Sequence, residues 1–215
     1  KQQEQTFNTS IVIFGCGGLG LSCIMISKAI GVQTIVAIDV SDSALQKARQ
    51  CGATHVILAP RDNKECRAKM QTNLYQQVVS CTGQEGADVC IDAGGFASTC
   101  ENAVYCTRRG GLMVQVGLPN SAPMIPMTRV AGWEIEIVGS HGFDAVNDMT
   151  NILDLVSHGK LQPKKLIERE VSLEVGVKAL MEMDKSSPLG ITMITNFHDS
   201  NGVDLNASVL VQSSL

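Results

Sequence analysis

The sequence predicts an α/β fold in which a doubly wound parallel sheet forms a single domain. Short runs rich in β-branched residues alternate with segments of helical periodicity, and this alternation is typical of strand–helix–strand units. The runs "IVIF", "TIVAI" and "LMVQV" are largely apolar, as expected for strands that helices cover on both faces. A chain of 215 residues is long enough for one such domain.

The expected elements follow in chain order. Strands are predicted at residues 10–14, 34–38, 55–58, 87–91 and 111–116, with helices between them at 18–30, 42–51, 64–80 and 97–107. Prolines at 119, 123 and 126 interrupt the alternation, which resumes with a strand near 134–139, helices at 145–158 and 173–184, and a last strand at 190–196. Gly31 is expected to end the first helix, and Ser41 and Gly52 to begin and end the second. The domain is expected to cover residues 10–197, after a polar lead-in at 1–9 and before a mobile tail at 198–215.

Composition limits the partners and the compartment. The chain carries 17 basic and 21 acidic residues, for a net charge of -4, and has no basic block, so we expect neither nucleic acid nor a membrane as a partner. Its 8 cysteines include no C-x-x-C pair, and no apolar run is long enough for a membrane span, which favours a cytoplasmic protein with reduced thiols. The chain starts with lysine shortly before a strand, so we expect further residues to precede Lys1 in the native protein.

The stretch "IVIFGCGGLG" predicts a nucleotide site. Gly15, Gly17 and Gly20 match G-x-G-x-x-G where a strand turns into a helix, and such glycines serve a tight turn, close approach to a pyrophosphate and close helix packing. The free amides and partial positive charge at the helix start favour phosphate. Asp39 is expected at the end of the second strand, where its carboxylate accepts from both hydroxyls of an adenosine ribose. Because this carboxylate would repel a 2′-phosphate, NAD(H) is the expected cofactor.

Two other interpretations of this region stay open. Cys16 lies where amides lower a thiol pKa and would make it redox-sensitive, although a small inert filler is the favoured interpretation. Methyltransferases that use S-adenosylmethionine also place a glycine turn after the first strand and an acid after the second, but the residue two before their first glycine is usually acidic, and here it is Ile13. A short-chain dehydrogenase is excluded, because neither Tyr75 nor Tyr105 has a lysine four residues later.

Longer segments resemble the cofactor-binding half of the zinc-dependent alcohol dehydrogenases, in the medium-chain dehydrogenase/reductase superfamily. These segments are "VIFGCGGLGLSCIMISKAIG", "VAIDVSDSALQKARQCGATHVI", "DVCIDAGG", "GGLMVQVGLP" and "EIEIVGSHGF". The resemblance covers about residues 8–197 and implies a Rossmann fold with the pyrophosphate at the glycine loop, the adenosine ribose at Asp39 and the nicotinamide at the later strand ends. The implied cofactor-binding residues are Gly15, Cys16, Gly17, Gly18, Leu19, Gly20, Asp39, Val40, Ala93, Gly94, Val116, Gly117, Leu118, Val138, Gly139 and Ser140.

The same resemblance implies that part of the catalytic machinery lies elsewhere. In the family a separate N-terminal domain supplies cysteine, histidine and acidic ligands to a catalytic zinc, which polarises the alcohol oxygen during hydride transfer. The 4 histidines, at 55, 141, 158 and 198, are dispersed, so we expect no catalytic residue, no metal ligand and no activity from this chain alone. Zinc and a small alcohol or aldehyde substrate are expected only in a complete enzyme. A non-catalytic NAD(H)-binding module and, less favoured, a methyltransferase remain alternatives.

Three further expectations concern the later strands. The segment "GWEIEIVG" is expected at the sheet edge, where the family forms a homodimer through its sixth strand, since an open edge invites pairing. The family frequently carries a basic residue on its final strand against the pyrophosphate, whereas here Thr192 or Met193 stands there, which weakens the expected binding. His141 is a lone imidazole in a turn and is interpreted as structural or solvent-facing.

Overall fold

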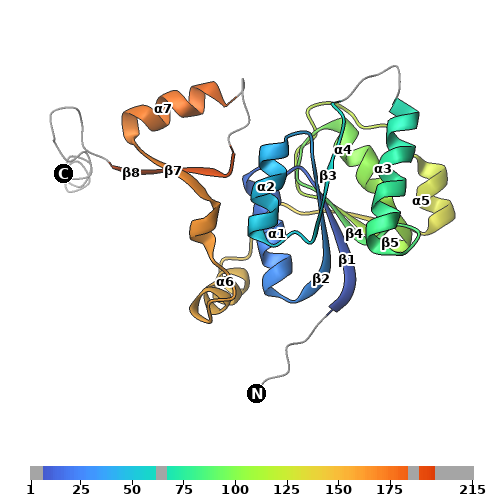
Figure 1. Ribbon diagram of the computed structural model, residues 1–215, viewed down its shortest axis with the longest axis horizontal. Helices are drawn as coiled ribbons and strands as arrows, with labels where there is room; N and C mark the ends of the chain where they lie inside the picture. The colour runs from blue at the N-terminus through green and yellow to red at the C-terminus, as the bar shows by residue number, and fades with distance from the viewer. Residues whose placement is uncertain (1–6, 62–66, 184–188, 197–215) are drawn as a thin grey trace.

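The computed structural model describes residues 7–61, 67–183 and 189–196. Its main feature is a parallel sheet of six strands (Figure 1). In spatial order these strands are β3 (His55–Leu58), β2 (Val32–Asp39), β1 (Phe7–Phe14), β4 (Ala87–Asp92), β5 (Thr107–Gln115) and β6 (Glu136–Gly139). The chain builds outward from β1 to β3, and then outward from β4 to β6 on the other side of β1. Ligands of such sheets bind at the carboxyl ends of the strands near this reversal.

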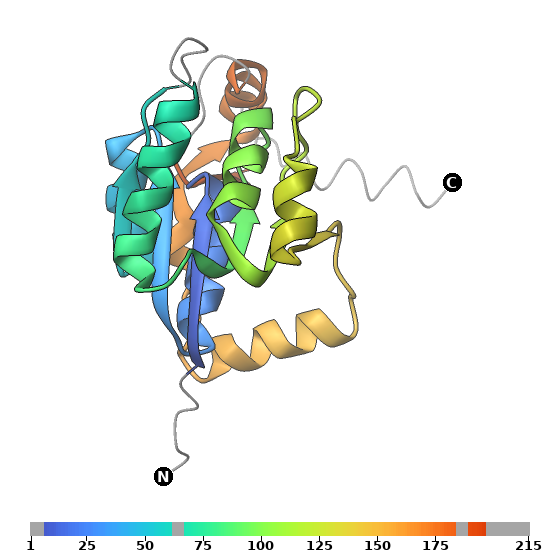
Figure 2. The same ribbon diagram turned by 90° about the vertical axis from the view of Figure 1, so that its right-hand side faces the viewer.

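Helices cover both faces of the sheet, one group on each side of the strands in Figure 1, and Figure 2 looks onto one of these faces. One face is covered by α1 (Gly18–Ala29) and α2 (Asp42–Cys51), and the other by α3 (Arg67–Thr82), α4 (Ala97–Cys106) and α5 (Met127–Trp133). A hydrophobic core lies on each face of the sheet, and successive residues of β1 belong to different cores. Ile13 is buried on the α1 face and Phe14 on the α3 face. The predicted doubly wound α/β class is confirmed, and the apolar strands are explained by burial on both sides.

The C-terminal part of the chain does not extend this sheet. After α6 (Asn147–Ser157) and the 3-10 helix η2 (Pro163–Leu166) come β7 (Ile167–Ser172), α7 (Leu173–Glu182) and β8 (Ile191–Asn196). Strands β7 and β8 pair in parallel as a separate two-stranded sheet, beside α1 and α2 (Figure 1). An ion pair of 2.8 Å between Lys47 of α2 and Glu168 of β7 links this small sheet to helix α2. The sequence predicts β8 but not its partner β7.

Most predicted elements are present, with small differences at their ends. β1 begins at Phe7, before the predicted strand, and α5 is not predicted at all. The predicted helix ends are confirmed: Ser41 accepts a hydrogen bond from the amide of Ala44, and Gly31 and Gly52 have φ angles of 92° and 119°. The predicted tail at 198–215 and the start of the helix expected at 64–80 lie outside the described residues.

Hydrogen bonds hold the amino ends of the central strands together. Ser10 of β1 donates to one carboxylate oxygen of Asp88 of β4, from its amide at 2.8 Å and from its hydroxyl at 2.7 Å. The Nε atom of Arg108 of β5 donates to the other oxygen at 2.7 Å. Burial alone would raise the pKa of Asp88, but these hydrogen bonds outweigh it and hold the pKa below its ordinary value. The cluster joins three strands at the end of the sheet opposite the predicted site.

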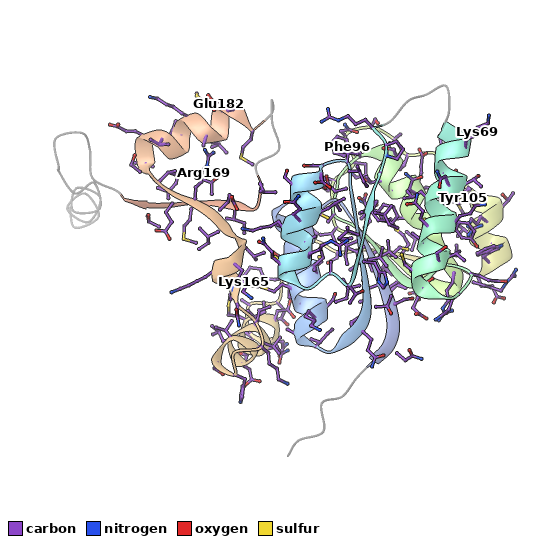
Figure 3. All side chains as sticks on the ribbon, in the orientation of Figure 1. Lys69, Phe96, Tyr105, Lys165, Arg169 and Glu182 are labelled. Carbon is purple, nitrogen blue, oxygen red and sulfur yellow. The ribbon has the colours of Figure 1, made fainter. Side chains whose placement is uncertain are left out.

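Aromatic contacts hold the short helix α5. The guanidinium of Arg129 lies 3.4 Å from the ring centre of Trp133 and 4.4 Å from that of Tyr105, which is labelled in Figure 3. Arg129 also donates to the carbonyl oxygen of Tyr105 at 2.7 Å. Such cation–π contacts stabilise by about 0.5–2 kcal/mol. Because tertiary contacts rather than apolar periodicity fix this helix, the sequence pattern does not predict it.

Candidate functional site

The glycine loop between β1 and α1 is closely packed. Gly15 has a φ angle of +88°, and a Cβ atom there would lie 2.6 Å from the Cα atom of Gly94. A Cβ atom on Gly20 would overlap the carbonyl oxygen of Gly15, because α1 starts directly beside the turn. A side chain on Gly20 would force α1 away from the turn, and one on Gly15 would displace the segment that follows β4. These two glycines therefore permit the turn and the close packing of the helix.

The start of α1 is open, in contrast to the loop behind it. Gly17 is the N-cap residue, and among the described residues no side chain caps the helix and no acidic residue lies in its first turn. Apart from Gly17 itself and the residues next to it in the chain, no described atom lies within 4 Å of the place where a Cβ atom of Gly17 would stand. The first-turn amides have no acceptor within the helix, so positive charge concentrates there. An anion in front of Gly17 would satisfy these amides.

Asp39 lies at the carboxyl end of β2, beside the glycine loop. One of its carboxylate oxygens accepts from the amide of Cys16 at 2.7 Å, and the other accepts from the amide of Ser41 at 2.8 Å. Each oxygen keeps a further lone pair, and the side chain is only partly buried. The neighbouring Val40 is exposed. Asp39 therefore fixes the loop and remains available to hydroxyl donors; the sequence indicates the second role but not the first.

Cys16 belongs to the core and not to the open surface of the loop. It is buried, and its thiol donates to the carbonyl oxygen of Ile38 at 3.8 Å. Burial, with the nearby Asp39 carboxylate, raises the pKa of this thiol far above its usual value. A thiol that stays protonated is a poor nucleophile, which favours the inert interpretation. The cysteines in the described part of the chain are free, without a disulfide.

The other predicted residues lie at the carboxyl ends of β4, β5 and β6. Backbone hydrogen bonds of 2.9 Å join these ends to their neighbours, from the amide of Ala93 to the carbonyl of Phe14 and from the amide of Ser140 to the carbonyl of Gln115. Leu118 is exposed, and so are Gly139 and Ser140. The structure thus brings the predicted residues to one edge of the sheet, namely Gly15 to Gly20, Asp39, Val40, Ala93, Gly94, Val116 to Leu118 and Val138 to Ser140.

Two polar residues behind this edge are not predicted from the sequence. Asp92 is the last residue of β4 and is fully buried, and Gln115 is the last residue of β5. The amide nitrogen of Gln115 donates to the Asp92 carboxylate at 2.7 Å. The available signal was a single polar side chain at the end of each largely apolar strand, in "VCID" and "LMVQ".

Strand β8 reaches the glycine loop. The Cγ1 atom of Ile191 lies 3.3 Å from the place of a Cβ atom on Gly18, so the last strand packs on the first turn of α1. The hydroxyl of Thr192 accepts from Arg169 of β7 at 2.9 Å, within the two-stranded sheet, and Figure 3 shows Arg169 between β7 and α7. β8 itself contains no basic residue. The strand therefore supplies apolar contact at the loop and no positive charge.

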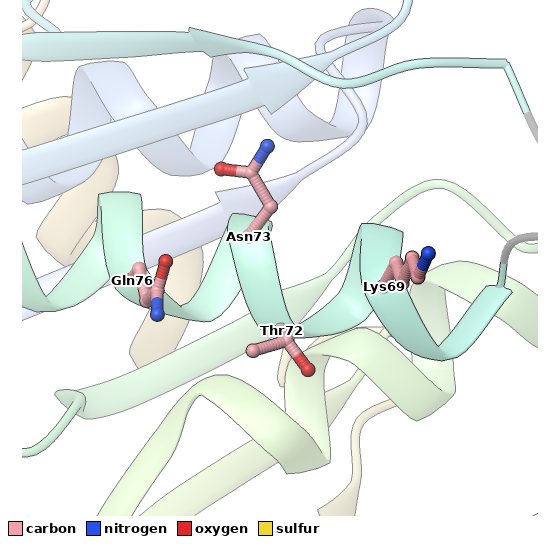
Figure 4. A pocket seen from close by; sticks show the side chains of 4 residues that line it. All are labelled: Lys69, Thr72, Asn73 and Gln76. Carbon is pink, nitrogen blue, oxygen red and sulfur yellow. The ribbon is translucent and has the colours of Figure 1, made fainter.

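Two other features of the surface are a depression on α3 and the histidine His141, which directly follows Ser140 at this edge. A shallow depression on α3 is lined by Lys69, Thr72, Asn73 and Gln76 (Figure 4). His141 is exposed. Within residues 7–61, 67–183 and 189–196, no three histidine, cysteine or acidic side chains gather where they would hold a metal ion. In the same part of the chain, no helix combines the length and apolar character that crossing a bilayer requires.

Comparison with curated proteins finds relatives named sorbitol dehydrogenase and D-xylulose reductase. Sorbitol dehydrogenase 1 of Saccharomyces cerevisiae is 30% identical over 173 residues, which are 80% of this chain and 47% of the relative. Probable D-xylulose reductase A of Aspergillus fumigatus is 30% identical over 203 residues, which are 93% of this chain and 53% of the relative. The chain therefore spans about half the length of the curated relatives it matches.

Solved structures and a family model agree with these relatives. The alcohol dehydrogenase of Aeropyrum pernix matches with a TM-score of 0.73 and 26% identity over 88% of this chain and 51% of its own. An Escherichia coli alcohol dehydrogenase in complex with NADH shares the fold, with a TM-score of 0.72 and 21% identity over 89% of this chain and 53% of its own. The family model for zinc-binding dehydrogenases matches residues 18–158. The resemblance deduced from the sequence is confirmed: the chain belongs to the zinc-binding dehydrogenase family.

Proposed function

We propose that this chain binds NAD(H) along the carboxyl edge of the six-stranded sheet. The observation that carries the proposal is the open start of α1, where uncapped amides face the empty space in front of Gly17. A pyrophosphate in that space supplies the acceptors that the helix lacks, and its charge is favoured by the helix dipole. The NADH complex of a protein with the same fold supports this assignment.

The two ends of the cofactor follow from this placement. Asp39 lies next to the loop and accepts hydrogen bonds from the hydroxyls of the adenosine ribose through its remaining lone pairs. The nicotinamide then extends across the reversal point to the ends of β4, β5 and β6. Ile191 of β8 packs beside the pyrophosphate position. Because β8 is not basic, the α1 amides provide the positive charge.

We propose that the complete protein is an oxidoreductase that transfers hydride between NAD and a small alcohol or aldehyde. Relatives named sorbitol dehydrogenase and D-xylulose reductase support a polyhydroxylated substrate class. The nicotinamide supplies the hydride acceptor when the cofactor is bound, and the residues of this chain bind and orient it. Zinc does not fit the described residues, where no ligand set gathers, so we expect it only in the complete protein. We expect this chain alone to be inactive.

We also propose that two copies pair through β6 and that the protein works in the cytoplasm. β6 is an edge strand of the main sheet, and its Ile137 is 42% exposed. Unpaired backbone groups on an edge strand favour two-fold pairing with a second copy. Free cysteines fit a reducing compartment. Sedimentation velocity tests the pairing: we expect a dimer that Ile137→Lys dissociates, and a wild-type monomer at high concentration would refute it.

A pair of glycine substitutions tests cofactor binding. Gly17→Ala adds a methyl group to the space assigned to the pyrophosphate, and no described atom outside its chain neighbours lies within 4 Å of it, so the fold should keep its stability. We expect NADH affinity measured by titration calorimetry to fall about tenfold or more, equivalent to about 1.4 kcal/mol. Gly132→Ala in α5 serves as the matched control and should bind NADH as the wild type does, because its methyl group also meets no described atom within 4 Å outside its chain neighbours and its own helix.

The outcome is decisive in both directions. Wild-type protein that binds NADH, with loss in Gly17→Ala and none in Gly132→Ala, supports the assignment. Undiminished binding of NADH by Gly17→Ala would refute the place of the pyrophosphate. A parallel titration with S-adenosylmethionine is expected to show no binding, and binding of that ligand in place of NADH would refute the cofactor.

A further inference from the structure

We propose that Gln115 and Asp92 form a buried pair that positions the two loops for the nicotinamide end of the cofactor. The inference deepens the proposed function and rests on it. Neither residue lies in the predicted site, and neither is expected to touch the cofactor. Each acts through backbone groups at the ends of β4 and β5, so both are positioning residues.

Asp92 anchors both loops. Its side chain is fully buried, and one carboxylate oxygen accepts from the amide of Gly94 at 2.9 Å. Its own backbone carbonyl accepts from the amides of Val116 and Gly117, at 3.0 and 2.8 Å. A single residue therefore holds the loop that follows β4 by its side chain and the loop that follows β5 by its main chain.

Gln115 closes this connection. Its amide nitrogen donates to the second carboxylate oxygen of Asp92 at 2.7 Å and to the carbonyl oxygen of Gly117 at 2.6 Å. Hydrogen bonds run from Gly94 through Asp92 and Gln115 to Gly117, so the two loops are tied by side chains as well as by the sheet. Hydrogen bonds to a charged acceptor are stronger than those between neutral groups.

The other end of the same side chain shows which of its two polar groups is used. The Oε1 atom of Gln115 is buried and has no hydrogen-bond partner among the described residues. Burying an amide oxygen without a partner is unfavourable, and a leucine would fill this strand position without that cost. The donor nitrogen therefore accounts for a glutamine here, because an apolar residue leaves both the Asp92 carboxylate and the Gly117 carbonyl short of a donor.

The loops need such an anchor because glycines form them. A Cβ atom on Gly117 would lie 2.5 Å from the amide nitrogen of Gly95, and Gly95 has a φ angle of +69°. Glycine backbone has many accessible conformations, so a fixed arrangement depends on hydrogen bonds. A displacement of about 1 Å at a reacting centre is enough to impair positioning strongly. Loosening these loops should weaken the hold on the nicotinamide and leave the adenosine end, at β1 and β2, unaffected.

The test compares two ligands in the full 215-residue chain. NADH and ADP-ribose share the pyrophosphate and the adenosine end, and only NADH carries the nicotinamide. For Gln115→Leu we expect the Kd of NADH to rise about tenfold, the fluorescence change of bound NADH to shrink, and the Kd of ADP-ribose to stay within about twofold. Gln77→Leu, the same substitution at an exposed position of α3, is the matched control and should change neither.

A second readout needs no ligand. Hydrogen exchange of the amides of Gly94 and Gly117 should be faster in Gln115→Leu than in the control, and Gln115→Met, which keeps the side-chain length without the donor, repeats the comparison if the leucine variant is unstable. Equal loss of NADH and ADP-ribose binding, no loss of either, or unchanged exchange would overturn the inference. Wild-type protein that binds neither ligand would refute the proposed function. The hydrogen-exchange comparison needs no ligand, so it still tests the connection between the two loops in that case.

Discussion

Replacement of Asp39 by asparagine should abolish most of the discrimination between NADH and NADPH. The carboxylate lies beside the glycine loop, where its oxygens accept from the amides of Cys16 and Ser41, so a 2′-phosphate would approach a fixed negative charge. Two unit charges about 4 Å apart repel by about 4 kcal/mol at an effective dielectric constant of about 20. Partial exposure and salt reduce this value, and we expect about 1–3 kcal/mol, or roughly 5- to 150-fold in favour of NADH.

Fluorescence titration of both cofactors measures this ratio in the wild type and in Asp39→Asn. The variant also loses part of the hydrogen bonding that supports the glycine loop. That loss weakens the binding of both cofactors, so it cancels in the ratio of their affinities. We expect the preference to fall below about fivefold. Asp42→Asn, at an exposed acid in the first turn of α2, is the control and should keep the wild-type ratio. Equal wild-type affinities, or an unchanged ratio in Asp39→Asn, would refute the electrostatic reasoning.

Three other predictions follow from packing and titration. Gly20→Ala places a methyl group against the carbonyl oxygen of Gly15, so the free energy of unfolding should fall by about 1–3 kcal/mol or more; calorimetry that finds a wild-type midpoint would contradict the described packing. The pKa of Asp88 is lowered in the folded state, so its carboxylate stabilises the fold above about pH 3.9 and this contribution is lost as the pH falls through the lowered folded value. Urea titrations at neutral and acidic pH should therefore show a smaller loss on acidification for Asp88→Asn than for the wild type, and identical losses would count against the hydrogen-bonded cluster. Burial and Asp39 raise the pKa of the Cys16 thiol, so iodoacetamide at pH about 8 should label it far more slowly in folded than in urea-unfolded protein, and mass spectrometry showing equal rates would place this thiol outside the core.

The main sheet was predictable because its strands carry a strong local signal. Most contain a short apolar run that ends at glycine or a polar residue, and helix patterns separate the runs. β7 lacks that signal, because "IEREVS" has charged residues at three consecutive positions. It forms a strand through pairing with β8, from which it is separated by α7. Pairing between distant segments is not visible in local periodicity, so the second sheet was not predicted.

The candidate site was predicted as a set of positions but not as a network. The spacing of Gly15, Gly17 and Gly20 indicated the loop, since each position has a separate steric requirement. Nothing in that spacing shows that Asp39 accepts from the amide of Cys16, because the contact depends on how β1 and β2 align. The connection through Gln115 likewise requires the neighbouring register of β4 and β5. Strand register is set by the whole sheet, and it determines which side chains meet.

The parallel order of the strands has a consequence for how the chain folds during synthesis. β1 lies at the centre of the sheet, yet its second neighbour is β4, and the hydrogen bonds between Ser10 and Asp88 span 78 residues. When β1, β2 and β3 have left the ribosome, one edge of β1 is still unpaired and its apolar side chains are uncovered on the side that α4 later covers. Non-local pairing of this kind slows folding and exposes intermediates to aggregation. Chains that stop before residue 87 should therefore associate with chaperones or aggregate. Chains that include β4 and α4 should be more resistant to proteases, because β1 is then paired along both of its edges.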